Sequence, residues 1–152
     1  MRTAITFALL IIAMSATAQR YNWKRPQLWV GVGMGFTSGL AWGVHEGLMY
    51  RYPYFQKRFP KANPQFWNPD ISWTNKYVNH DPEQGRNNKP IFMTDAKHLL
   101  ASTYQVSIFS AGIVVVIGEK RPWWHYALDI CAVALARSGG NYIGYDLLCR
   151  RP

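Results

Sequence analysis

A glycine occupies every fourth position along one segment of this chain, at Gly31, Gly35, Gly39, Gly43 and Gly47. In water, each glycine inside a helix costs about 0.5–1 kcal/mol relative to alanine, so this segment would form a poor soluble helix. Inside a membrane the same spacing lets two helix backbones approach closely, because positions four apart form one ridge along a helix. The series therefore predicts a membrane helix with these five glycines as its packing residues.

Residues 29–36 allow a second interpretation. Their sequence, "WVGVGMGF", alternates glycine with larger apolar residues, as a lipid-facing strand of a β-barrel does. The alternation ends at Phe36, whereas the four-residue glycine series continues to Gly47. The longer period favours the helix.

The composition also favours a membrane. Hydrophobic residues make up 49% of the chain and charged residues only 16%, against about 25% charged in typical soluble domains. Long segments with almost no charge lie at residues 27–50, 99–118 and 123–137, and about 20 apolar residues span a bilayer core. We expect an all-α fold, a small bundle of about three hydrophobic, transmembrane helices.

The chain after the third segment is expected to add one short helix. The sequence "SGGN" at residues 138–141 should break the third helix, and residues 142–149 should form a separate C-terminal helix. Because the apolar segments are close to the minimum length for spanning, a helical bundle in the periplasm or at the outer membrane is the alternative.

Residues 1–18 have the pattern of a signal peptide. Arg2 precedes an apolar run at residues 5–14, and Ala16 and Ala18 form a small-residue cleavage pattern. We therefore expect export in a bacterium, with residues 19–152 forming a single helical membrane domain. An uncleaved signal anchor is the alternative.

Residues 51–92 are expected to form an irregular loop. Six of the nine prolines lie here, and Lys and Arg outnumber acidic residues by seven to three, with aromatic residues between them. Such a mixture suits single-stranded nucleic acid or the lipid headgroup region. Because an exported protein is separated from nucleic acid, we expect a loop at the membrane surface and no nucleic-acid partner. The cations place this loop on the cytoplasmic side, which favours the inner membrane over the periplasm or outer membrane.

Tryptophan and tyrosine commonly anchor membrane proteins at the headgroup level. The loop and the start of the third helix supply such residues. The expected membrane-interface residues are Trp67, Trp73, Tyr77, Trp123 and Trp124.

Each predicted helix carries one histidine and one acid, in the pairs His45 with Glu46, Asp95 with His98, and His125 with Asp129. Ionisable groups in a membrane segment suggest a functional site. One interpretation is a metal-dependent hydrolase of lipid or envelope substrates, with the first four residues as candidate catalytic groups. The other is that all six lie near helix ends, where they reach water or cap the helix. The second is favoured, so we expect no bound metal and no cofactor.

The two cysteines, Cys131 and Cys149, have no metal-binding spacing and are either packing residues or one disulfide. No nucleophile elbow, phosphate-binding loop or zinc-protease motif occurs. An enzymatic role is therefore not expected.

Three stretches carry a family resemblance: "WGVHE", "FPKANPQFWNPDISWTNKY" and "FMTDAKHLL". Together with the signal sequence they resemble an uncharacterised family of small exported membrane proteins of Bacteroidota and their mobile elements. The resemblance implies a location in the cell envelope and brings no activity. We expect a structural or partner-binding role, with membrane lipid and either a second copy or another envelope protein as partners.

Overall fold

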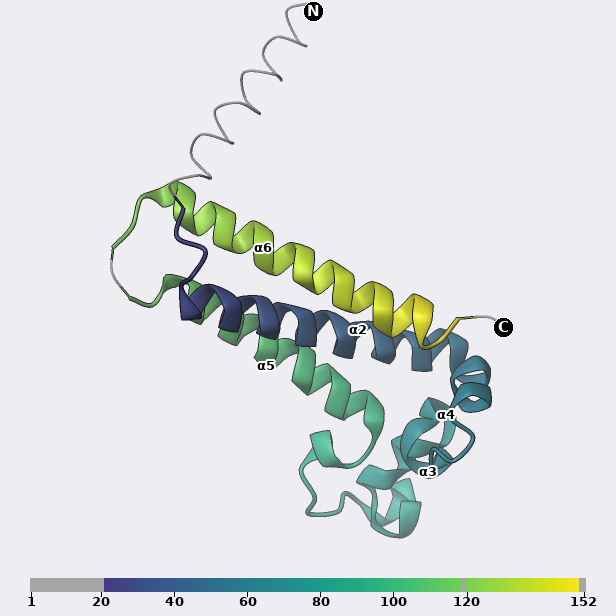
Figure 1. Cartoon of the computed structure of the whole chain (residues 1–152). Helices are drawn as coiled ribbons and strands as arrows, with labels where there is room; N and C mark the ends of the chain where they lie inside the picture. Colours follow the sequence, from purple (N-terminus) through teal and green to yellow (C-terminus); the bar gives the residue numbers. More distant parts are fainter. Residues whose placement is uncertain (1–20, 119, 151–152) are drawn as a thin grey trace, which may run out of the picture.

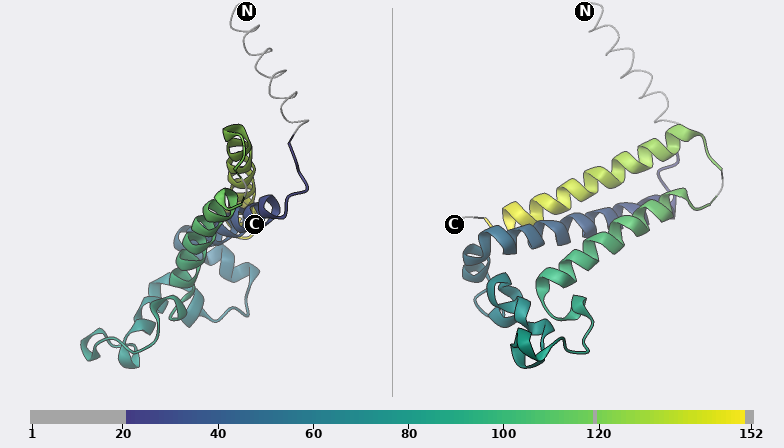
Figure 2. Two further views of the ribbon diagram at one scale, coloured as in Figure 1. Left: turned by 90° about the vertical axis from the view of Figure 1, so that its left-hand side faces the viewer. Right: turned by 180° about the vertical axis from the view of Figure 1, so that it is seen from behind.

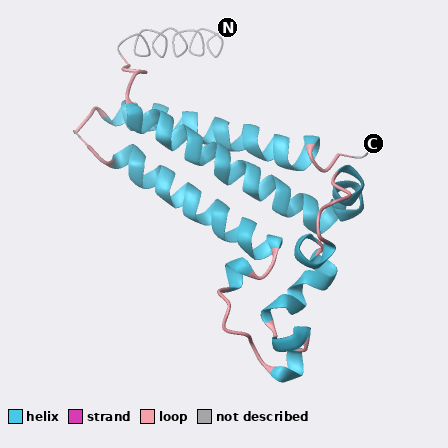
Figure 3. Ribbon diagram, turned by 60° about the horizontal axis from the view of Figure 1, so that its bottom comes forward, coloured by secondary structure: helices cyan, strands magenta, loops and turns pink. Residues whose placement is uncertain are grey.

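The computed structural model describes residues 21–118 and 120–150. The expected signal peptide, residues 1–18, lies outside the described residues. The described part is mostly helical and contains no strand (Figure 3), which confirms the all-α expectation. Its long helices are α2 (Pro26–Arg58), α5 (Ala96–Val116) and α6 (Trp123–Tyr142), the last continuing into the π-helical turn η5 (Ile143–Leu147).

The three long helices form a layer with α2 in the middle. Helix α6 packs along one side of α2 and α5 along the other, whereas α5 and α6 barely touch each other. Helices α2 and α6 run in the same direction, and α5 runs back between them in sequence (Figures 1 and 2). Because α5 and α6 each pack mainly against α2, much of their surface has no protein cover.

Helix α2 extends further than the sequence indicated. The expected loop at residues 51–92 would start at Arg51, but the structure has a kink there (φ −136°, ψ 24°) and the helix resumes to Arg58. Pro53 explains the kink, because it has no N–H to donate to Met49 and its ring crowds that carbonyl. The loop therefore begins at Phe59.

The segment between α2 and α5 is built from short helical turns. Asn63 and Asn68 each precede a proline, and their side chains accept hydrogen bonds from Gln65 N and Asp70 N, both at 3.0 Å. An asparagine cap followed by proline is a common start of a helix, so each Asn-Pro pair begins a short helix. The turns are α3 (Pro64–Trp67), α4 (Pro69–Ser72), η1 (Trp73–Lys76), η2 (Val78–His80), η3 (Pro82–Gln84) and η4 (Ile91–Met93).

The predicted break at "SGGN" is wrong. Helix α6 runs through residues 138–141 and continues without interruption into η5. The predicted separate helix at residues 142–149 is therefore the end of α6. Tertiary packing outweighs the low helix propensity of glycine here, because Gly140 and Gly144 lie against the backbone of α2.

The expectation of about three spanning helices is also wrong in number. Among the described residues, one helix is long and apolar enough to cross a membrane, namely α5. The glycines and polar side chains of α2 and the polar residues of α6 lower the hydropathy of those two helices.

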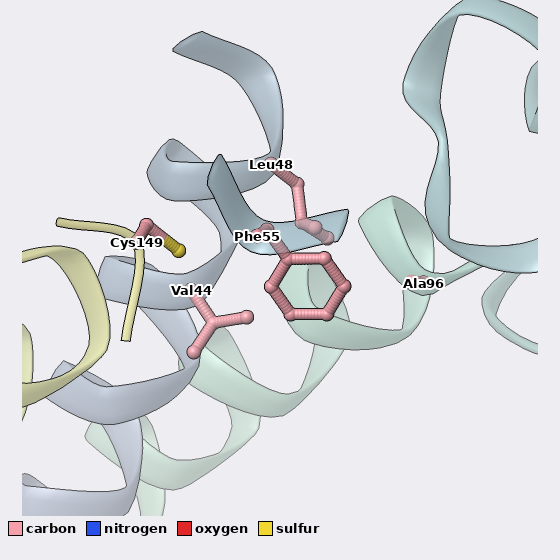
Figure 4. Packing of buried hydrophobic residues seen from close by; sticks show 5 residues of the cluster. All are labelled: Val44, Leu48, Phe55, Ala96 and Cys149. Carbon is pink, nitrogen blue, oxygen red and sulfur yellow. The ribbon is translucent and has the colours of Figure 1, made fainter. Parts of the chain in front are cut away.

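The buried apolar residues form two clusters at opposite ends of the layer. The larger one joins α2, the first residue of α5 and the end of the chain (Figure 4); it contains Val44, Leu48, Phe55, Ala96 and Cys149. The smaller one contains Ala111, Val115 and Val133 and joins the end of α5 to the middle of α6. Between them, α2 and α6 are held together by the glycines.

Candidate functional site

The structure places the five glycines of the series on the side of α2 that faces α6. All five are buried. A Cβ atom at Gly35 would lie 2.7 Å from the carbonyl oxygen of Val133, and one at Gly39 would overlap the carbonyl of Arg137. Gly31 is less tight, since a Cβ there would lie 3.3 Å from Val115 Cγ2. The two backbones thus approach too closely for most of these positions to accept even a methyl group.

Helix α6 and the turn η5 that follows it contribute matching glycines that the sequence analysis missed. A Cβ atom at Gly144 would lie 2.6 Å from the carbonyl oxygen of Leu40, and one at Gly140 would lie 2.8 Å from the amide nitrogen of Leu40. Gly140 and Gly144 are themselves four residues apart. The same period that identified the glycines of α2 could have identified this pair.

Asp129 links three segments at one end of the layer. Its carboxylate is 1% exposed and lies 2.5 Å from Arg25 Nη2 and 2.8 Å from Arg121 Nη1. Arg25 directly precedes α2, and Arg121 also donates a 2.6 Å hydrogen bond to the carbonyl of Val115 near the end of α5. Through these two cations, one buried carboxylate of α6 fixes the position of α2 and α5 relative to α6.

Asp95 forms the N-cap of α5. Its Oδ1 accepts a 2.9 Å hydrogen bond from His98 N, and its Oδ2 lies 2.7 Å from His98 Nδ1 and 3.1 Å from Thr94 Oγ1. These contacts occupy both oxygens of a carboxylate that is 1% exposed. Asp95 and His98 therefore stabilise the start of α5 in this structure.

His45 lies among aromatic residues of α2 and α5. Its ring stacks on Trp42, with ring centroids 5.5 Å apart, and Tyr104 meets Trp42 edge-on at 4.7 Å. Its Nδ1 lies 3.4 Å from Glu46 Oε1, an ion-pair distance without hydrogen-bond geometry. The main contacts of the imidazole are therefore with aromatic rings, and it forms no hydrogen bond with Glu46.

The candidate catalytic residues His45, Glu46, Asp95 and His98 do not converge on a metal-binding geometry. Among the residues that the structure describes, no three His, Cys, Asp or Glu side chains are grouped closely enough to hold a metal ion. The third pair, His125 and Asp129, lies near the start of α6, at the end of the layer where the Arg25 and Arg121 contacts occur.

The expected membrane-interface residues take different positions. Trp123 is 80% exposed and Trp73 is 43% exposed, whereas Trp124 packs edge-on against His125 with centroids 3.9 Å apart. Tyr77 lies 6.0 Å from Trp73, and Lys76 Nζ sits 5.2 Å from the Tyr77 ring centroid. Trp73, Lys76 and Tyr77 form a surface group in which two aromatic rings and a cation lie together.

Trp67 differs from the other four because it faces inward. Its ring centroid lies 5.3 Å from that of Phe55, and it packs against the larger buried cluster.

The two cysteines are both free thiols, Cys131 exposed and Cys149 buried, so they form no disulfide.

Comparison of the chain with protein-family models, with curated proteins and with solved structures found no match in any of the three. The functional interpretation accordingly rests on the geometry described above.

Proposed function

We propose that this chain is an exported helical membrane protein with a structural or partner-binding role in the bacterial cell envelope, in the inner membrane. Helix α5 would cross the bilayer, and α2 and α6 would remain joined through their glycines. The segment between Phe59 and Met93 would lie at the headgroup level and contact lipid or an envelope partner.

The observation that carries the proposal is the surface of α5. This helix has 21 residues, and only Ala96, Ala111 and Val115 are buried. Large apolar side chains point away from the protein, including Val106 at 65% exposed and Phe109 at 73% exposed. A helix of 21 residues is about 30 Å long, which matches the hydrocarbon core. Lipid would cover this apolar face.

The charge distribution supports the orientation. The last turn of α2 and the segment between α2 and α5 carry six cations, which are Lys57, Arg58, Lys61, Lys76, Arg86 and Lys89. At the other end of the layer the described residues include four cations, Lys24, Arg25, Lys120 and Arg121, which is fewer than these six. Under the positive-inside rule the segment between α2 and α5 would face the cytoplasm.

The glycine contacts limit where a partner can bind. The five glycines of the four-residue series are covered within the same chain by α5, α6, η5 and Cys149, so they offer no free face to a second copy. A partner would instead contact the exposed sides of α5 and α6 or the surface group around Trp73 and Tyr77.

Carbonate extraction of isolated membranes tests the proposal, using the full chain and two lysine variants. Phe109→Lys places a charge in the middle of the exposed side of α5, where insertion scales give a cost of about 2.5–3.5 kcal/mol. Ile71→Lys is the matched control, because Ile71 is 41% exposed and lies in α4, outside the proposed spanning region.

We expect the unaltered protein and Ile71→Lys to stay in the membrane pellet, and Phe109→Lys to be released in larger part. Release of the unaltered protein as a folded, monodisperse species would contradict a membrane location. Equal retention of both variants would contradict the assignment of α5 to lipid.

A further inference from the structure

An open cavity of about 730 Å³ lies where the end of α2, α3 and the end of the chain meet. Its apolar walls include Val44, Phe55, Trp67 and Leu148. These residues come from α2, from α3 and from the residues after η5, and Figure 4 shows Val44 and Phe55 close together in the larger buried cluster. Pockets that hold small ligands usually measure about 300–1,000 Å³, so the volume suits a ligand.

Two cations also line this apolar cavity. They are Arg58, from the last turn of α2, and Lys61, from the link to α3. Arg58 Nη1 donates a 2.7 Å hydrogen bond to the carbonyl of Leu147, which fixes the guanidinium and leaves its other nitrogen atoms available. Neither side chain forms an ion pair within residues 21–118 and 120–150.

We propose that this cavity binds an acyl chain that carries an anionic head group, with the head held by Arg58 and Lys61. Apolar walls suit the chain, because burying each CH₂ strengthens binding by up to about fourfold. A carboxylate or phosphate suits the cations, because a guanidinium presents paired N–H groups to either anion. A neutral apolar ligand would leave both cations without a counter-charge.

This binding site is a property of the folded chain and does not depend on whether the layer crosses a bilayer. Both a free fatty acid and an anionic phospholipid have the required chemistry. The experiment therefore uses purified full-length protein in a mild detergent, where its result is independent of the extraction test above.

Trp67 provides the readout. Bromine atoms on an acyl chain quench tryptophan fluorescence on contact, so dibromostearate should quench a component that is absent in Trp67→Phe and retained in Trp73→Phe. Trp73 is the matched control because it lies outside the cavity and is 43% exposed. Non-brominated palmitate should reverse the quenching of this component.

The role of charge is tested by changing first the ligand and then the protein. Dibromostearate methyl ester has the same chain but no charge, and we expect it to bind at least about tenfold more weakly, as for the loss of a hydrogen-bonded charge. Lys61→Gln should weaken dibromostearate and leave the ester unchanged. Brominated phosphatidylglycerol, compared with brominated phosphatidylcholine, then shows whether a phospholipid is the source of the chain.

Three results would overturn the proposal. The first is identical quenching of the unaltered protein and Trp67→Phe, which would show that the chain does not enter the cavity. The second is equal affinity for the acid and its methyl ester. The third is dibromostearate binding that is unchanged in Lys61→Gln.

Discussion

Gly39 and Gly33 lie on the same helix and differ in what surrounds them. A methyl group at Gly39 would overlap the backbone carbonyl of Arg137, whereas one at Gly33 would meet no atom within 4 Å. A backbone carbonyl inside a helix cannot move aside as the end of a flexible side chain can. The value of glycine is therefore a property of single positions, and only those in the four-residue series require it.

We predict that Gly39→Ala destabilises the protein by about 1–3 kcal/mol, because α2 and α6 must separate to admit the methyl group. Gly33→Ala should leave stability unchanged or raise it by up to about 1 kcal/mol, because alanine is the better helix former. Thermal unfolding in detergent, followed by far-ultraviolet circular dichroism, measures both. Similar losses in the two variants would show that helix packing does not explain the effect.

At the scale of elements, the end of α6 and η5 closes onto α2. Cys149 is fully buried, and a Cβ atom at Gly47 would overlap its sulfur. Burial also raises the pKa of the Cys149 thiol. Burial keeps a labelling reagent away from the sulfur. The raised pKa keeps the thiolate scarce, and only this deprotonated form attacks the reagent.

We predict that Cys149 resists maleimide in the native protein and reacts after denaturation. The measurement uses a Cys131→Ala background, because Cys131 is exposed and would otherwise react. Adding Gly47→Ala should displace the chain end and make Cys149 reactive without denaturant. Adding Gly33→Ala instead should leave it protected, and rapid labelling in that control would mean that the chain end is not held by α2.

Part of this arrangement could be predicted from the sequence. The period of the glycines identified a close helix contact, and Asp95 before a long apolar run indicated the start of α5. Sequence reasoning failed where tertiary packing outweighs local propensity, as at Gly140 in "SGGN", where α6 continues because α2 packs against it. It also failed at Arg51, because a single proline kinked α2 instead of ending it.

The site was harder to predict than the helices. Two of the three pairs of histidine and acid, Asp95 with His98 and His125 with Asp129, have the spacing of one helix face, but the partners of each side chain depend on which helices are neighbours. Asp129 was paired with His125 on periodicity, whereas the structure pairs it with Arg25, 104 positions away, and with Arg121. The cavity beside Trp67 likewise combines residues 44–67 with Leu148, which lies far away in the sequence, and no local pattern reveals this.

At the scale of the whole molecule, the layer is closed differently at its two ends. One end has the apolar cluster around Phe55, and the other has the buried carboxylate of Asp129 with its two arginines. Because α5 and α6 barely touch, α5 is held to α6 mainly through α2 and through Arg121. The ion pair between Arg121 and Asp129 therefore helps to fix the position of α5 relative to α6.

We predict that Asp129→Asn destabilises the protein by about 3–5 kcal/mol, because it leaves Arg25 and Arg121 without their counter-charge at a site where their side chains are only 14% and 13% exposed. Asp70→Asn, at an exposed carboxylate in α4, is the control and should change stability by less than about 0.5 kcal/mol. Replacing Arg121 by glutamine in the Asp129→Asn background should cost less than the same replacement in the unaltered protein, because one unpaired cation is then removed. Strictly additive losses in this double-mutant cycle would show that Asp129 and Arg121 do not interact, and that α5 is held to the layer by its contacts with α2 alone.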